Sequence, residues 1–343
     1  MRYPIAVATA ISVMALFAAG CGDDDDGGGA AGGGTASQES LRVALVLPDF
    51  TQNELILDQK TGAEAEAEKL GIELTTTGSG DAAEQARAVQ NAIAAKVDAI
   101  VYNTIDAEAL TPAIEEANAA GIPVVCSNAC AAGGENAAEI TFDYKQMGQI
   151  TGEWLAEQVP SGGKVGIVDS NRADASVQQI YEGMDAGLAA GGADPELVIS
   201  PPTDWDAAKG LKVATDLFTA NPDFEAVVCF HDLLLDACNQ AMEATNYKDV
   251  PLAGLGGTCA GLAAVLAGDA QATVAQFLYK AGALGVSAAQ KAVDGEDAAS
   301  LSETAPMVGI TDESAKGMLD GSVEAPPDTG LEDKLKSAEG GCK

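Results

Sequence analysis

An α/β fold with two Rossmann-like, doubly wound lobes is predicted for this chain from two observations. Short apolar runs alternate with amphipathic segments of helical length, which is typical of βαβ units and parallel sheets. This alternation runs from Leu41 to Cys126 and begins again near Lys164. In addition, 47% of the residues are hydrophobic but only 4% are aromatic, so aliphatic side chains must fill the interior, as they do where helices cover buried parallel strands.

The first lobe begins near Leu41 and reads as alternating strands and helices. Gly71 and Gly121 each follow an amphipathic run directly, which is the usual position of a helix-ending glycine. The expected strands cover 41–47, 72–77, 99–102 and 122–126, and the expected helices cover 54–70, 81–95 and 107–120.

The second lobe shows the same alternation of strands and helices. Strands are expected over 164–168, 197–200, 226–230, 251–255 and 272–276, and the expected helices include 144–158, 207–220 and 233–245. In open α/β sheets, ligands bind beyond the carboxyl ends of the strands. Polar and aromatic residues gather at those ends, namely Asn53, Asn103, Asn128, Trp205, His231 and Gln276. A ligand site is therefore expected there.

Residues 1–20 have the features of a secretory signal peptide. Arg2 precedes an uncharged apolar run that ends at Phe17, and small residues follow directly before Cys21. This arrangement resembles a bacterial lipobox, which implies cleavage before Cys21 and lipidation of that cysteine. Residues 21–40 then form a flexible, glycine-rich tether. The alternative is a soluble secreted protein cut nearby; in both cases the mature chain works outside the cytoplasm.

Charge and hydropathy exclude several classes of partner. The formal net charge is −34, from 52 acidic and 18 basic residues, so the surface repels nucleic-acid phosphates and anionic lipid. A salty habitat could also account for this acidity. No apolar run after the leader is long enough to span a bilayer, and membrane attachment is therefore expected only through the lipid anchor.

Six cysteines remain besides Cys21, and an even number in an exported protein favours disulfides. The spacing of Cys126 and Cys130 allows a local bond, and Cys238 and Cys259 could meet if their helices are neighbours. The connectivity is otherwise open. The single histidine, His231, is not at ligand spacing from a cysteine pair, so no metal site is expected, and no cofactor either.

Several stretches carry a resemblance to a known family: 61–71, 97–106, 119–125, 202–211, 221–223 and 272–276. Together they resemble the ribose-binding-protein-like periplasmic binding proteins, which are sugar-capturing lipoproteins of ATP-binding-cassette (ABC) importers. The resemblance covers nearly the whole chain after Leu41. It implies a binding protein rather than an enzyme, expected as a monomer, whose ligand-bound form is recognised by permease subunits.

The resemblance also implies the type I, or Venus-flytrap, architecture, in which a three-segment hinge joins the lobes. The crossings are expected near 142–143, 276–277 and 306–307. This divides the chain into an N-terminal lobe of residues 41–142 plus 277–306 and a C-terminal lobe of residues 143–276 plus 307–343. Ligand binding then shifts an equilibrium between open and closed forms by hinge bending.

The expected ligand-binding residues are Asn53, Ile56, Asn103, Asn128, Gln178, Trp205, His231 and Gln276. The resemblance implies that Asn53 and Gln276 are retained, while Ile56 stands where sugar binders often have an aromatic. Asn128, Gln178 and Gly256 stand where the family commonly has charged Asp or Arg side chains. Charge-assisted hydrogen bonds to a sugar would thus be lost, which favours a neutral polyhydroxy ligand, either bulkier than a hexose or partly apolar.

Structural roles remain open for four of these residues. Trp205 could be ordinary core, the lone His231 could be structural, Gln276 could satisfy backbone groups at the hinge, and Asn128 could shape a turn. The function expected from the sequence is capture of a small carbohydrate or polyol for an ABC permease. A sensory receptor that signals to a membrane kinase or chemoreceptor is the alternative, and a secreted hydrolase is a third possibility that no motif supports.

Overall fold

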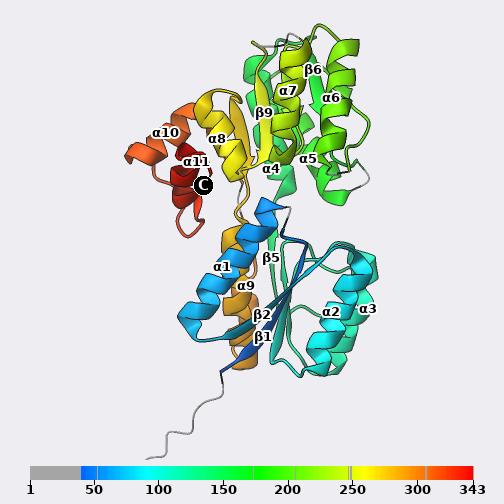
Figure 1. Ribbon diagram of the computed structural model, residues 1–343, viewed down its shortest axis with the longest axis vertical. Coiled ribbons are helices and arrows are strands. Elements are labelled where there is room, and N and C mark those ends of the chain that lie inside the picture. Colours follow the sequence, from blue (N-terminus) through cyan, green and yellow to red (C-terminus); the bar gives the residue numbers. More distant parts are fainter. Residues whose placement is uncertain are drawn as a thin grey trace, which may run out of the picture. The chain divides into compact units, whose positions relative to one another are not determined.

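Two six-stranded sheets, each covered on both faces by helices, form the framework of the protein (Figure 1). The computed structural model describes residues 40–51, 53–172, 174–204, 206–245, 247, 249–305 and 307–342. Cys21, Trp205 and Pro306, which carry the expected lipid, a ligand contact and the third crossing, lie outside the described residues. None of the helices in the described part is long and apolar enough to cross a membrane.

The first sheet has the strand order β11-β5-β4-β3-β1-β2, and all its neighbouring strands are parallel. Strand β1, next to the edge strand β2, pairs Leu45 with Thr76 of β2 on one side and with Val101 of β3 on the other. The strands are β1 Arg42–Pro48, β2 Glu73–Ser79, β3 Ala99–Tyr102, β4 Val124–Ser127, β5 Ala138–Phe142 and β11 Glu303–Ala305.

The second sheet has the order β12-β10-β9-β8-β6-β7, in which only β12 runs antiparallel to its neighbour. The strands are β6 Lys164–Val168, β7 Glu196–Ile199, β8 Ala226–Cys229, β9 Leu252–Gly256, β10 Ala272–Ala275 and β12 Val308–Thr311. The expected α/β fold with two parallel-dominated lobes is therefore confirmed. The short strands β5, β11 and β12 were not expected from the sequence.

The helices connect and cover these strands. In chain order they are α1 Glu54–Leu70, α2 Ala82–Ala94, α3 Ala107–Ala119, α4 Tyr144–Gln158, α5 Ala175–Ala190, α6 Ala207–Ala220, η1 Asp232–Leu234, α7 Leu235–Thr245, α8 Cys259–Ala267, α9 Leu278–Val293, η2 Ala298–Leu301, α10 Asp312–Asp320 and α11 Leu331–Glu339.

The two faces of the first sheet pack against different helices. Val43 and Leu45 of β1 belong to the core that contains α1 and α9, whereas Ala44 and Val46 belong to the core beneath α2 and α3. Figure 1 shows α1 and α9 on one side of this sheet and α2 and α3 on the other. Because both faces are buried, the strand is a continuous apolar run rather than an alternating one.

The second sheet is layered in the same way. Val165 and Ile167 of β6 share a core with α4 and α5, and Val168 shares another with α6 and α7. Phe218, whose ring centroid lies 6.1 Å from that of Phe224, belongs to this second core. Phe218, Phe224 and Tyr247 form an aromatic group in this core, while aliphatic residues fill most of the interior.

Glycines allow the helix backbones of α4 and α5 to touch. A β-carbon at Gly148 would lie 1.9 Å from the carbonyl oxygen of Ile180, and one at Gly183 would lie 1.9 Å from that of Lys145. Each of these glycines is followed by another one turn later, at Gly152 and Gly187. No side chain larger than a hydrogen atom fits at these distances, so the glycines set the separation of the two helices.

The disulfides partly differ from the expectation. Cys126–Cys130 is confirmed as a local bond. The possible pairing of Cys238 with Cys259 is not formed, since Cys238 bonds Cys229 and Cys259 bonds Cys342. The physical reason is that α7 packs its cysteine onto the end of β8, in the core beneath α6 and α7, whereas α8 begins beside the C-terminal helix α11.

The contact between α4 and α5 leads to a prediction about stability. Replacing Gly148 by Ala should lower the free energy of unfolding by about 2 kcal/mol, because the new methyl group must push two helix backbones apart. This loss would occur although alanine favours helices intrinsically. Urea unfolding followed by circular dichroism measures the change.

Gly340→Ala is the matched control, since a β-carbon there meets nothing closer than 3.4 Å and the backbone φ is −81°. It should change stability by less than about 0.5 kcal/mol. Equal stability of the Gly148 and Gly340 variants would show that the helix contact is not tight.

Candidate functional site

A cavity of about 910 Å³ lies at the carboxyl ends of strands from both sheets. The first sheet supplies residues that follow β1, β3 and β4, and the second sheet supplies residues that follow β6, β8 and β9. Gln276, directly after β10, also lines it. This position is where open parallel sheets bind ligands, and the volume is in the range of small-molecule sites.

Asn53 and Ile56 reach the cavity from the start of α1. Asn53 is the N-cap of that helix, and its Oδ1 accepts a hydrogen bond from the Leu55 N–H at 3.1 Å. Within the described part of the chain its Nδ2 donates no hydrogen bond, so this amide remains able to bind a ligand oxygen. Ile56 is buried and adds an apolar surface beside it.

Asn103 lines the same wall, but its side chain is already used within the protein. It is 1% exposed, and its Nδ2 donates to Gln59 Oε1 at 2.8 Å. Its Oδ1 accepts from the Ala129 N–H at 3.3 Å. Gln59 in turn donates to Ser127. Asn103 therefore holds the loop after β4 in place.

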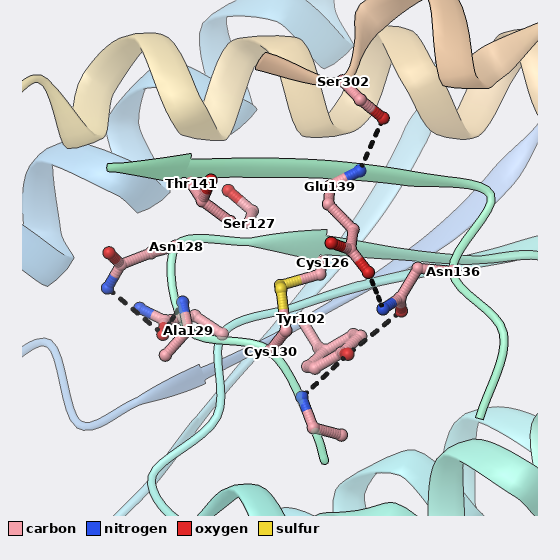
Figure 2. The surroundings of a disulfide bond; sticks show 12 residues. Tyr102, Cys126, Ser127, Asn128, Ala129, Cys130, Asn136, Glu139, Thr141 and Ser302 are labelled. Carbon is pink, nitrogen blue, oxygen red and sulfur yellow. Dashed lines mark hydrogen bonds between the residues drawn. A yellow bond between two sulfur atoms is a disulfide. The ribbon is translucent and has the colours of Figure 1, made fainter. Parts of the chain in front are cut away.

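Asn128 adopts a left-handed backbone conformation with φ 94°, so it does shape a turn. Its Oδ1 accepts a hydrogen bond from the Tyr144 hydroxyl at 3.0 Å, and both residues line the cavity. Figure 2 shows Asn128 in the loop closed by the disulfide between Cys126 and Cys130. The loop is thus fixed by a covalent bond and by side-chain hydrogen bonds.

Tyr102 supports this loop from below. Its hydroxyl accepts from the Ala131 N–H at 3.1 Å and donates to Asn136 Oδ1 at 3.0 Å (Figure 2). The ring is fully buried in the core beneath α2 and α3. The wall of the cavity formed by the first sheet therefore has few polar side chains left without a partner.

His231 lines the opposite part of the cavity at the end of β8. Its backbone φ of 142° lies in a region that favours glycine, and its Nδ1 accepts the Leu233 N–H at 3.1 Å. Burial lowers the pKa of His231 to about 4, so the ring is neutral at pH 7. Because Nδ1 is an acceptor, the ring proton is on Nε2. The residue thus serves both as a helix cap and as part of the cavity wall.

Asp232, next in the chain, links the segments that follow β8 and β9 to strand β10. Its carboxylate accepts from the Thr258 N–H at 2.8 Å and from the Thr273 hydroxyl at 2.8 Å. The side chain is 3% exposed, and burial raises the pKa of Asp232 to about 6. A β-carbon at Gly256 would lie 3.4 Å from this carboxylate. Any side chain at position 256 would therefore contact the Asp232 carboxylate.

Gln276 and Gln178 were both expected to contact the ligand, but they occupy different positions relative to the cavity. Gln276 lines the cavity, and its buried Oε1 has no hydrogen-bond partner within the described residues. Gln178 is exposed, donates to the Arg172 carbonyl at 3.3 Å and is not among the described residues that line the cavity. Gln179, one position later, lines it instead. Helix α5 begins directly after its N-cap Asp174, and this starting point decides which of its residues face the cavity.

Several of the described residues that line the cavity were not expected from the sequence. Tyr144 and Met147, on the first turn of α4, reach the cavity, and the position of Tyr144 right after an expected crossing could have indicated this. Ser170 follows β6 and also lines the cavity. Only its place at a strand end could have marked it, since a serine in a loop is otherwise unremarkable.

The shifted pKa values of the adjacent residues His231 and Asp232 predict how the stability of the protein depends on pH. The stability contributed by neutral His231 is present above pH 6.5 and is lost as the pH falls towards 4. The stability contributed by protonated Asp232 is present below pH 3.8 and is lost as the pH rises through 6. The two contributions therefore oppose each other between pH 4 and pH 6.

Asp232→Asn should lose about 2 kcal/mol of stability relative to the parent protein as the pH falls from 6.5 to 4.5. His231→Asn, whose Oδ1 can keep the cap, should gain stability relative to the parent over the same range. Urea unfolding at several pH values measures both slopes. Parallel pH profiles for the parent and both variants would contradict the two pKa shifts.

Comparison with known proteins agrees with this architecture. The profile of the periplasmic binding protein domain matches residues 43–297. The chain is 32% identical over 255 residues to the ribose import binding protein of Escherichia coli K12, covering 74% of this chain and 85% of that protein. It is 25% identical over 295 residues to the xylitol-binding protein of Mycolicibacterium smegmatis, covering 85% and 80%.

Solved structures share the fold. An ABC transporter solute-binding protein from Mycobacterium smegmatis with bound glycerol has a TM-score of 0.73 at 25% identity, over 81% of this chain and 96% of that one. The Caulobacter myo-inositol binding protein has a TM-score of 0.73 at 21% identity, over 80% and 94%. The predicted type I architecture is confirmed, and the chain belongs to the periplasmic binding protein family.

Proposed function

We propose that this protein is an extracytoplasmic solute-binding lipoprotein of an ABC transporter, which captures a small neutral carbohydrate or polyol and delivers it to the permease. The observation that carries the proposal is the cavity at the strand ends, in which the amide of Gln276 has a buried oxygen without a partner. The protein binds its ligand and does not convert it.

The charges around the cavity favour a neutral ligand. No lysine or arginine is found among the described lining residues. The carboxylates that line it, Asp106 and Asp174, cap the first turns of α3 and α5 and accept backbone N–H groups there. A phosphate or carboxylate ligand would therefore meet acidic groups and no compensating cation.

The relatives support this ligand class. They are named for ribose and xylitol, and related structures hold glycerol and myo-inositol. All four are uncharged molecules that carry several hydroxyl groups. Neutral donors and acceptors such as Asn53 and Gln276 can bind such groups without the cost of burying a charge.

The order of the strands supports the two proposed lobes. The chain passes between the sheets after β5, after β10 and between β11 and β12. α9 packs on α1 through Gly62 and Gly282, each facing a backbone carbonyl of the other helix. We therefore assign residues 41–142 and 277–306 to one lobe and 143–276 and 307–343 to the other, with ligand-dependent closure about the three crossings.

Contacts between the two proposed lobes lie beside the cavity. Lys334 of α11 forms an ion pair with Asp58 of α1 and donates to the Gly257 carbonyl at 3.3 Å. Glu54, in the first turn of α1, accepts a hydrogen bond from the N–H of Cys259. These polar contacts on the α1 side must adjust whenever the lobes rotate, so they contribute to the balance between open and closed forms.

The proposed location follows from the N-terminal sequence and the cysteines. Cys21 would carry the lipid, and residues 22–40 would hold the binding domain away from the membrane surface. Three disulfides join the remaining six cysteines, which fits an oxidising compartment. The acidic surface would also keep the domain apart from anionic lipid. We expect a monomer.

The proposal predicts the effect of removing the Gln276 amide. Gln276→Ala should weaken binding about tenfold, because at least one hydrogen bond to the ligand is lost in a buried place. Isothermal titration calorimetry with D-ribose, xylitol, glycerol and myo-inositol measures the affinity of the parent and the variant. The protein should also leave each bound probe chemically unchanged.

Gln240→Ala is the matched control, since Gln240 is exposed on α7 and donates to Asp236 on the same helix. It should bind like the parent. Equal affinity of the Gln276 and Gln240 variants would give Gln276 a structural role. Failure of the parent to bind any of the four probes would contradict the proposed ligand class.

A further inference from the structure

The wall of the cavity that belongs to the second sheet contains buried polar atoms without partners. Ser170 lines the cavity and is fully buried, and its Oγ has no hydrogen-bond partner within the described residues. Oδ1 of Asp169, which is 1% exposed, and Oγ1 of Thr203, which is fully buried, also have no hydrogen-bond partner within the described residues. These two residues are not among the described residues that line the cavity and lie next to the Ser170 segment instead. Buried polar groups are normally paired, so such a group near Ser170 needs an explanation.

These three residues are held together by their backbones. The Thr203 N–H donates to the Asp169 carbonyl at 3.0 Å, and the Asp204 N–H donates to the Ser170 carbonyl at 2.8 Å. The Asp169 N–H donates to Ser200 Oγ at 3.0 Å. The segment after β6 is thus joined to the segment after β7. Backbone groups of both segments are hydrogen-bonded, whereas Asp169 Oδ1, Ser170 Oγ and Thr203 Oγ1 have no partner within the described residues.

The opposite wall is different. There Asn103, Gln59 and Ser127 satisfy one another in a closed network. An unpaired buried polar group costs roughly 1–3 kcal/mol of stability, and functional sites are where such costs are usually retained. The difference between the two walls therefore points to a ligand group on the side of Ser170.

We propose that Ser170, with Asp169 and Thr203 behind it, forms a subsite that binds hydroxyl groups of the ligand. This inference rests on the proposed function and specifies which side chains of the second sheet recognise the ligand. Nothing in the resemblance to the family places a ligand contact at these three positions.

The chemistry of the three side chains selects hydroxyl groups. An ionised Asp169 only accepts hydrogen bonds, whereas the hydroxyls of Ser170 and Thr203 both donate and accept. A matching group must therefore donate to a carboxylate and also exchange hydrogen bonds with hydroxyls. An alcohol does both, and a pair of adjacent alcohols offers two such groups.

Charged ligand groups fit less well. An anion would be repelled by Asp169. The carboxylate of Asp169 already interacts with the charge of Arg172, which is not among the described residues that line the cavity and whose guanidinium carbon lies 4.4 Å from the ring centroid of Tyr181. The attraction of Asp169 for a cationic ligand is thereby reduced. The hydroxyl of Tyr181 is also buried without a partner within the described residues. A neutral diol avoids the repulsion by Asp169 and needs no charged partner.

Ser170→Ala and Asp169→Asn test the proposal in the full-length protein, with D-ribose, xylitol and myo-inositol as probes. Each variant should bind the probe preferred by the parent at least about tenfold more weakly. Without ligand, Ser170→Ala should keep or raise the melting temperature, because the variant no longer buries an unpaired hydroxyl. Calorimetric titration and thermal unfolding measure the two effects.

Ser79→Ala is the matched control. Ser79 is 2% exposed and its Oγ is likewise unpartnered, but no residue of its strand β2 is among the described residues that line the cavity. It should bind the probes like the parent. Unchanged binding by Ser170→Ala, or a clear fall in its melting temperature without ligand, would overturn the subsite in favour of a structural role. If the parent binds none of the probes, the proposed function fails first, and the subsite with it.

Discussion

Close contact between glycine-bearing helices is the constraint on which the rest of the structure depends. In the pair α4–α5, the backbone at Gly148 and Gly183 touches the partner helix directly, and Gly62 and Gly282 do the same in the pair α1–α9. With side chains of ordinary size, packed helices lie 8–10 Å apart. Here the separation is set by backbone atoms, which cannot change their rotamers. Each pair therefore acts as one rigid body.

These helices are also the ones that begin at the cavity. α1 starts after Asn53 and α5 starts after Asp174, while α4 and α9 follow the first two passages between the sheets. A rigid pair therefore fixes the position of a cavity residue relative to a crossing. On our proposal, rotation about the crossings would move each wall of the cavity as a unit, with little rearrangement inside it. The same contacts thus serve both packing and the geometry of binding.

The fold could be predicted from the sequence much further than the site. Apolar runs such as Val43–Leu47 identify buried parallel strands because both of their faces are covered. The role of Asn103 could not be predicted, since its partners Gln59 and Ala129 meet only in the folded chain. The register of α5, which brings Gln179 rather than Gln178 to the cavity, depends on where the Asp174 cap begins the helix. Long-range disulfides such as Cys259–Cys342 depend likewise on tertiary packing.

On our proposal, the two walls of the cavity contribute to ligand binding in different ways. The wall of the first sheet is stiffened by the Cys126–Cys130 disulfide and by the network around Asn103, so it offers a preformed surface at little entropic cost to the ligand. The wall of the second sheet keeps Ser170 and its neighbours unpaired. On our proposal, hydroxyl groups of the ligand would pair these atoms and remove the cost of leaving them buried alone. Binding would then favour the form in which both walls contact the ligand. In that form the unpaired polar atoms of the second wall gain hydrogen bonds, and the hydrogen bonds within the first wall are kept.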